Sequence, residues 1–306
     1  MKKAGLLVKP QWAWNDEGVK KVRMLMLPAL FGVSVTQINL LLNQVIASFL
    51  VTGSITWLYY SDRLIEFPLG IFGIAISTVV LPTLSKIAKQ KALNETARQA
   101  QFQTTMDWGV RMVLLLGIPA MIGIATLAQP MMMTLFMRGK FGLSDVIASS
   151  HSLWIMCLGL NSYMLISILA NGFYANQNTK TPVKIGLIAT ACNMCFGLLA
   201  IPFGYLGLAM ASALSAAVNA SLLYRQLSKQ GIYHISRKTI FFILKVAIAA
   251  LVMGGLVNYF SPHLEEWFEM STLMKAYWLG WLIVLAVISY FAMLFILGIR
   301  KWDFRS

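Results

Sequence analysis

The 306-residue chain is poor in charged residues, and above all in acidic ones. Only 12% of its residues are charged, and Asp and Glu together number 11 against 25 Lys and Arg. A soluble globular domain usually carries about 25% charged residues. With 58% hydrophobic residues and a mean hydropathy of +0.71, the composition excludes that class and indicates a polytopic membrane protein.

Residues that build metal and redox sites are also scarce, with three Cys and three His in the whole chain. Cys157, Cys192 and Cys195 all fall in apolar segments, where a free Cys is usually a small packing residue. No further Cys or His completes a ligand set, and the H-E-x-x-H, G-x-S-x-G and P-loop motifs are absent. We therefore expect no metal site, no cofactor and no enzymatic activity.

What the sequence does contain is a series of long apolar segments separated by short polar loops. Each segment has the roughly 20 apolar residues that a membrane-spanning helix requires. Eight segments meet this requirement: residues 25–50, 55–81, 110–133, 152–174, 183–201, 206–227, 239–260 and 273–297. The sequence therefore predicts an all-α membrane protein with eight transmembrane helices.

The basic residues are distributed unevenly between the two sides of this arrangement. Nearly all of them lie in the N-terminus, in alternate loops and in the C-terminus, whereas the opposite loops hold only Arg138, Lys140 and Lys275. Loops rich in Lys and Arg stay in the cytoplasm. The net charge of +14 thus reflects membrane topology rather than nucleic-acid binding, and both termini are predicted to be cytoplasmic.

The second predicted span contains three charged residues, although a charged side chain in hydrocarbon costs about 2.5 kcal/mol or more. Asp62, Arg63 and Glu66 lie on one face with Tyr59 when the helix turns by about 100° per residue. We call these four residues the charged stripe. Arg63 lies roughly 12 Å from the outer end of the helix at 1.5 Å per residue. Small residues continue the same face, namely Gly70, Gly73 and Ser77.

Two interpretations of the charged stripe remain open. In the first, Arg63 neutralises Glu66 and Asp62 within a buried network that fixes helix packing. In the second, which we favour, the stripe faces a hydrated cavity, because two carboxylates and one guanidinium leave a surplus negative charge that a dry bundle tolerates poorly. The guanidinium suits an anionic phosphate, and the carboxylates suit holding it or binding a coupling proton or cation. Pro68 is expected to bend the helix beside these charges.

Weaker candidates for substrate contact lie on other spans. Asn43 and Gln37 in the first span suit either hydrogen bonding between helices or substrate contact. Lys184 and Arg111 lie near cytoplasmic helix ends, where long basic side chains extend to the lipid headgroups.

The segment Gly53 to Pro68, with the sequence GSITWLYYSDRLIEFP, closely resembles the corresponding segment of the MurJ (MviN) family of lipid II flippases. Further segments resemble that family in the same order: LPTLS at 81–85, MDWGVR at 106–111, GFYA at 172–175, KTPVKI at 180–185 and NASLLY at 219–224. The resemblance extends over essentially the whole chain.

This resemblance implies a MOP-superfamily transporter of the bacterial cytoplasmic (inner) membrane that flips a lipid-linked peptidoglycan precursor by alternating access. It implies that Arg63 engages the diphosphate or sugar headgroup, with Asp62 and Glu66 beside it. The expected partners are that precursor and membrane lipids, with no nucleic acid. Coupling to a monovalent cation, a proton or the membrane potential stays open.

The resemblance also implies a division of the chain into three parts. Residues 1–24 correspond to a cytoplasmic linker, residues 25–227 to the second six-helix lobe, and residues 228–306 to two helices that form a groove for the polyprenyl tail, followed by a short cytoplasmic C-terminus. Members of the family have more spans than this chain. We therefore expect it to be incomplete alone, either as a fragment or as the partner of a separately encoded first lobe.

Two other functions remain as alternatives. One is a different MOP-type exporter, such as a polysaccharide-lipid flippase or a cation-coupled small-molecule antiporter, which would not need a bulky and unpolar pair of final helices. The other is a membrane scaffold that transports nothing.

Overall fold

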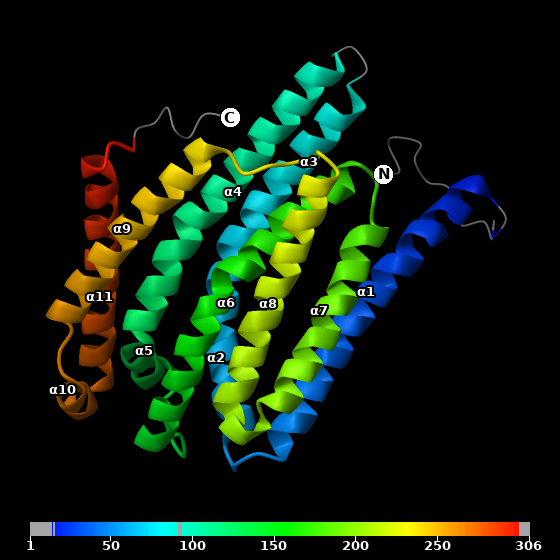
Figure 1. The fold of residues 1–306 in the computed structure, drawn as a ribbon. Helices are drawn as coiled ribbons and strands as arrows, with labels where there is room; N and C mark the ends of the chain where they lie inside the picture. Colours follow the sequence, from blue (N-terminus) through cyan, green and yellow to red (C-terminus); the bar gives the residue numbers. More distant parts are fainter. Residues whose placement is uncertain (1–13, 15, 91–93, 300–306) are drawn as a thin grey trace, which may run out of the picture.

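The computed structural model describes residues 14, 16–90 and 94–299, apart from the side chains of residues 21, 25, 27–36, 38 and 39. Over these residues the chain is helical and contains no strand (Figure 1). The α-helices are α1 (Glu17–Ser48), α2 (Ser54–Pro68), α3 (Ala75–Lys89), α4 (Glu95–Thr126), α5 (Ala128–Leu135), α6 (Leu143–Ala175), α7 (Lys180–Leu199), α8 (Gly204–Lys229), α9 (Arg237–Phe260), α10 (Leu264–Glu269) and α11 (Thr272–Ile296). A π-helical segment, Leu69–Ile74, joins α2 to α3, and a 3-10 turn, Ile201–Phe203, precedes α8.

Within the described residues, seven helical segments are long and apolar enough to cross a membrane. They correspond to the second through eighth predicted spans, so the prediction of an all-α polytopic membrane protein is confirmed. The first predicted span falls on α1, a helix of 32 residues in which many side chains lie outside the described set. The total of eight spans therefore stays a prediction. The largest difference in a boundary is at α4, which begins at Glu95 and not at the predicted residue 110.

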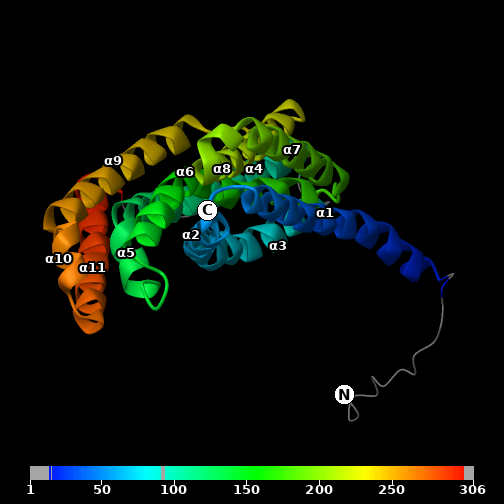
Figure 2. The same ribbon diagram turned by 90° about the horizontal axis from the view of Figure 1, so that it is seen from below.

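Helix α6 is the centre of the bundle and contacts α2, α3, α4, α5 and α8 (Figures 1 and 2). Its side chains Leu160, Met164 and Ile168 are completely buried. The hydrophobic effect provides little driving force for helices to associate inside lipid. Their association depends instead on close van der Waals packing at small residues. Accordingly, Ala209 and Ala213 of α8 are buried.

Helices α9 and α11 pack against each other at one edge of the bundle, and α9 also packs along α4 (Figure 1). Bulky side chains on their outer sides are exposed, including Phe241, Leu251 and Phe295. The pair therefore lies at the periphery and presents an apolar surface suited to lipid.

Pro68 changes the helix that carries the charged stripe. The π-helical segment begins at the next residue, since Pro lacks the N–H that an α-helical hydrogen bond needs at this point. The wider turn rotates every later side chain relative to α2. As a result Gly70 is exposed, whereas Gly73 is buried and Ser77 accepts a hydrogen bond from Asn171. The prediction that small residues continue the stripe to Ser77 is wrong for this reason.

The close approach of α6 to α8 makes a stability prediction. A Cβ atom on Gly159 would lie 2.9 Å from the backbone Cα of Ala213, whereas a Cβ on Gly186 of α7 would meet nothing within 4 Å. Ala is favoured over Gly in a helix by about 1 kcal/mol. Gly186→Ala should therefore keep or raise the melting temperature, while Gly159→Ala should destabilise the bundle by about 1–3 kcal/mol through overpacking. Thermal unfolding in one detergent compares the two variants, and equal melting temperatures would contradict the packing.

Candidate functional site

Helix α2 presents two different faces, and the buried face fixes its position on α6. Ser61 Oγ is hydrogen-bonded to the carbonyl oxygen of Ser149 at 2.8 Å, and Leu64 and Ile65 are buried beside it. Near the start of α2, Trp57 Nε1 donates a hydrogen bond of 2.8 Å to Asp145 Oδ1. These contacts hold one face of α2 firmly, so Arg63 and Glu66 on the opposite face point away from the bundle.

Arg63 and Glu66 form an ion pair on the outward face, with 2.6 Å between Arg63 Nη1 and Glu66 Oε2. Their side chains are 53% and 55% exposed. The Arg63 guanidinium also lies over the Tyr59 ring, 4.9 Å from its centroid. The pairing of Arg63 with Glu66 in the first interpretation is therefore present, but within the described residues the pair lies at the surface of the bundle and not in a buried network. Such exposed pairs stabilise a fold by only about 0–1 kcal/mol.

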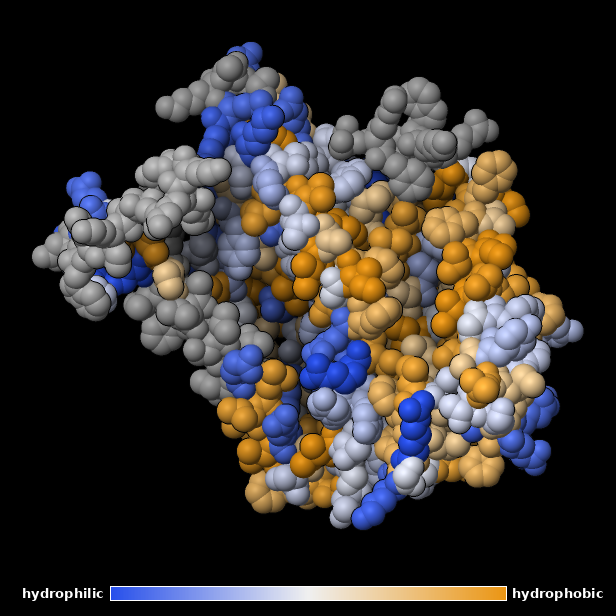
Figure 3. All heavy atoms as spheres, turned by 180° about the vertical axis from the view of Figure 1, so that it is seen from behind, coloured by the Kyte–Doolittle hydropathy of each residue, from blue (hydrophilic) through white to orange (hydrophobic). Residues whose placement is uncertain are grey.

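The surface around α2 agrees with this geometry. Figure 3 views the molecule from behind, the side on which α2 and α3 lie, and shows hydrophilic residues in the middle of a largely hydrophobic surface. Most Arg63 N–H groups have no partner among the described residues, since Glu66 receives the one hydrogen bond that Arg63 makes there. The guanidinium is thus oriented by Glu66 and Tyr59 and still free to bind an anion.

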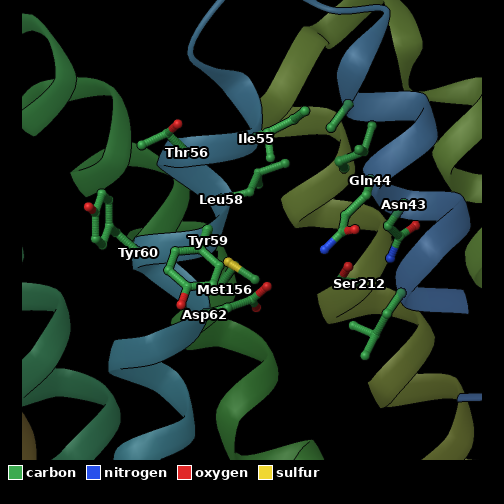
Figure 4. A pocket seen from close by; sticks show the side chains of 13 residues that line it. Asn43, Gln44, Ile55, Thr56, Leu58, Tyr59, Tyr60, Asp62, Met156 and Ser212 are labelled. Carbon is green, nitrogen blue, oxygen red and sulfur yellow. The ribbon is translucent and has the colours of Figure 1, made fainter. Parts of the chain in front are cut away.

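A cavity of about 300 Å³, in which polar side chains lie among mostly apolar ones, adjoins the stripe between α1, α2, α6 and α8. Figure 4 shows Asp62 and Tyr59 of α2 on one side and Asn43 and Gln44 of α1 on the other, with Ser212 of α8 between them. Asp62 makes no ion pair or hydrogen bond within the described part of the chain. Its carboxylate is therefore available to a ligand, a cation or a proton in this cavity.

The four weaker candidates separate in space. Asn43 lines the cavity next to Asp62, whereas Gln37 is an exposed residue of α1 that does not line it. Lys184 lines a different pocket between α7 and α8. Arg111 lies on α4, outside the cavity lining.

Arg111 instead belongs to a cluster that fastens the segment between α8 and α9 to α4. Its Nε donates to Thr239 Oγ1 at 2.8 Å, and its Nη2 lies 4.0 Å from Asp107 Oδ2. The buried Tyr233 hydroxyl donates to Asp107 Oδ1 at 2.8 Å, and burial raises the pKa of Tyr233 above its usual range. The MDWGVR segment therefore has a structural role here, and the interpretation of Arg111 as a side chain extending to headgroups is wrong.

Sequence reasoning missed two contributors to the site. Thr56 lines the cavity, and Ser212 does so from within an Ala-rich segment that signals only helix packing. The link from Trp57 to Asp145 joins residues 88 positions apart, so local patterns carry no trace of it. The one signal in the sequence that could have indicated a cavity position was a polar residue, Ser212, within a run of small apolar residues.

An apolar groove of about 340 Å³ runs on the other side of α2. Leu64, Phe67 and Pro68 form its α2 wall, while α4, α5, α9 and α11 supply the rest, including Val287 and Tyr290. Tyr290 directs its hydroxyl to the carbonyl oxygen of Leu115 at 2.6 Å, which removes the polar atom from the groove. Helix α2 thus has charged residues on one side and a wall of an apolar groove on the other.

Membrane-length helices that keep charged side chains exposed within a span, beside a cavity with polar side chains and an apolar groove, are features found in membrane transporters. The family model described as "Lipid II flippase MurJ" matches residues 1–278. The chain therefore belongs to the MurJ family of lipid II flippases.

Individual comparisons agree with this membership. A Haemophilus influenzae protein called "Probable lipid II flippase MurJ" is 64% identical over 301 residues, which are 98% of this chain and 59% of that protein. A solved structure described as "Lipid II flippase MurJ, inward closed conformation" matches with a TM-score of 0.74 at 23% identity, over 97% of this chain and 58% of that one. A MOP superfamily transporter from Pyrococcus furiosus matches with a TM-score of 0.53 at 17% identity, over 78% of this chain and 54% of that one.

The two structural matches show a shared MOP-type fold. The chain spans about 59% of the length of the Haemophilus influenzae relative.

Proposed function

We propose that this chain is part of a transporter that moves a lipid-linked peptidoglycan precursor, lipid II, from the inner to the outer leaflet of the bacterial cytoplasmic membrane. The observation that carries the proposal is the charged stripe, whose Arg63 is half exposed deep within a membrane-length helix. Family membership supports the substrate class. Since the chain spans about 59% of a curated relative, we propose the activity for a whole in which another membrane-embedded part faces the stripe.

The headgroup end of the substrate fits the chemistry of the stripe. A guanidinium binds two phosphate oxygens through parallel N–H donors, and Glu66 and Tyr59 hold Arg63 ready for this contact. Arg63 carries one positive charge, whereas a diphosphate carries two or more negative charges. The part of the protein that faces the stripe should therefore supply further cationic side chains. Alternating access then requires the two halves to rock around the shared site.

Coupling to an ion would rest on Asp62. No group of three or more His, Cys, Asp or Glu that could hold a metal ion occurs among the described residues. A proton, or a monovalent cation bound by Asp62 with the amide oxygens of Asn43 and Gln44, fits the cavity better than a divalent metal. The proposed transport needs no cofactor, and the membrane potential remains a second energy source.

The tail end of the substrate fits the apolar groove. Its walls come from α2 and from the peripheral pair α9 and α11, so a polyprenyl chain lying there would reach α2 just behind the stripe. This supports residues 228–306 as the pair of tail-groove helices, and we propose residues 1–24 as a linker and 25–227 as the second lobe from the family resemblance alone. We propose cytoplasmic termini from the distribution of Lys and Arg.

Exchange of the stripe's ion-pair partners tests the headgroup role. The double variant Arg63→Glu with Glu66→Arg keeps the net charge and the pair but moves the guanidinium about 4.5 Å along the helix. Hydrogen bonds to charged groups contribute about 1.5–3 kcal/mol, so lipid II flipping in the complete protein should fall about tenfold or more at equal expression. Glu95 and Arg98 of α4 offer a matched control, because they form the same spacing of ion pair at 2.6 Å.

The exchange of Glu95 and Arg98 should leave flipping intact. A scaffold that transports nothing predicts that both exchanges are tolerated in cells depleted of the native flippase. Normal flipping by the Arg63 and Glu66 exchange would therefore reject the proposed headgroup contact.

Filling the apolar groove tests the tail role. Val287 lines the groove, whereas its neighbour Ile288 is 62% exposed and does not line it. Val287→Trp should obstruct an isoprenoid chain and slow lipid II flipping several-fold. Ile288→Trp should remain close to wild type, because Ile288 lies outside the groove and a Trp there still faces apolar surroundings. Flipping measured in proteoliposomes compares them. If both variants flip normally, or if deletion of residues 239–306 leaves full activity, another MOP-type exporter becomes the better assignment.

A further inference from the structure

A second polar pocket lies at the opposite end of the bundle from the first turn of α2, between the start of α7 and the end of α8 (Figure 1). Its volume is about 470 Å³, and it is lined by the basic residues Lys180, Lys184, Arg225 and Lys229 together with Thr181 and Gln226. No acidic residue lines it. We call it the α7–α8 basic pocket.

The basic side chains of this pocket are placed where like charges repel one another and, in α7, where the helix dipole disfavours cations. Lys180 and Lys184 are one helical turn apart, as are Arg225 and Lys229, and like charges at this spacing repel by about 0.2–0.5 kcal/mol. Lys180 and Lys184 also lie in the first two turns of α7, where the helix dipole favours anions over cations. With respect to the helix dipole, only Arg225 and Lys229, near the C-terminal end of α8, are favourably placed. An anion between the two helices would relieve all of these repulsions.

None of the four side chains is neutralised within the described part of the chain. The ion pairs found there join Arg63 to Glu66, Arg98 to Glu95 and Arg111 to Asp107. The rule that places basic residues on the cytoplasmic side explains their number but not their convergence on one hollow. Lys86 and Lys89 of α3 satisfy the same rule as exposed residues that do not line the pocket.

We propose that the α7–α8 basic pocket binds a phosphate-bearing anion at the cytoplasmic surface of the membrane. Apolar residues, Ile185, Ile188 and Leu222, line the same pocket beside the cations, an arrangement that suits the headgroup and glycerol region of an anionic phospholipid. A soluble diphosphate offers the same charged group without the apolar part. The site shares no residue with the cavity beside Asp62, so it stands independently of the transport proposal.

Lipid binding to the purified protein tests this site. Native mass spectrometry with added phosphatidylglycerol should show binding that the double variant Lys184→Gln with Arg225→Gln weakens roughly tenfold to thirtyfold, as expected for two basic residues near an anionic headgroup. The control variant Lys86→Gln with Lys89→Gln removes the same charge from the same side of the membrane and should change binding less than about twofold. Phosphatidylcholine should bind the unmodified protein, the pocket variant and the control variant equally.

A competition arm identifies the source of the phosphate. Displacement of phosphatidylglycerol by inorganic diphosphate assigns the site to phosphate groups in general, and failure of displacement assigns it to lipid headgroups; both agree with the proposal. Equal losses in the pocket variant and the control variant, or no loss in either, would overturn it. If the double variant does not fold, Lys184→Gln and the charge-conserving Lys184→Arg decide the question, because only the first should weaken binding.

Discussion

The whole arrangement depends on one constraint, the cost of placing charge inside a membrane-length helix. Asp62, Arg63 and Glu66 occupy such a helix, and an unpaired charge in hydrocarbon costs about 2.5 kcal/mol or more. The structure meets this cost by exposure, since Arg63 and Glu66 are each more than half exposed on one face of α2. The opposite face is tied to α6 through Ser61 and the buried Leu64. The contacts with α6 on one side of α2 therefore leave a charged and exposed face on the other.

The same division explains why α2 suits a substrate with two unlike ends. Its charged face adjoins a polar cavity, and its other side forms one wall of an apolar groove. The π-helical segment after Pro68 ends the polar face by rotating later residues toward α6. Polar and apolar binding regions are thus kept apart on one helix, while the cluster around Asp107 and Tyr233 fastens the peripheral helices to α4.

Most of the fold could be predicted from the sequence because apolar length and charge asymmetry are strong signals in membrane proteins. The charged stripe was visible for the same reason, since Arg63 interrupts an otherwise apolar span. The loss of the face beyond Pro68 was not visible, because a π-helical turn breaks the 100° periodicity on which that projection rests. The roles of Ser212, Trp57 and Arg111 depend on partners that are distant in sequence, and periodicity carries no information about them.

The central claim is that water reaches the charged face of α2 deep within the membrane, and accessibility to a water-soluble maleimide tests it most directly. In this chain with Cys157, Cys192 and Cys195 replaced by Ala, single cysteines would be placed at Glu66, which is exposed, and at Leu64, which is 7% exposed. The account predicts rapid labelling of Glu66→Cys in membranes and almost none of Leu64→Cys. Equal labelling of the two positions, or an unreactive Glu66→Cys, would contradict it.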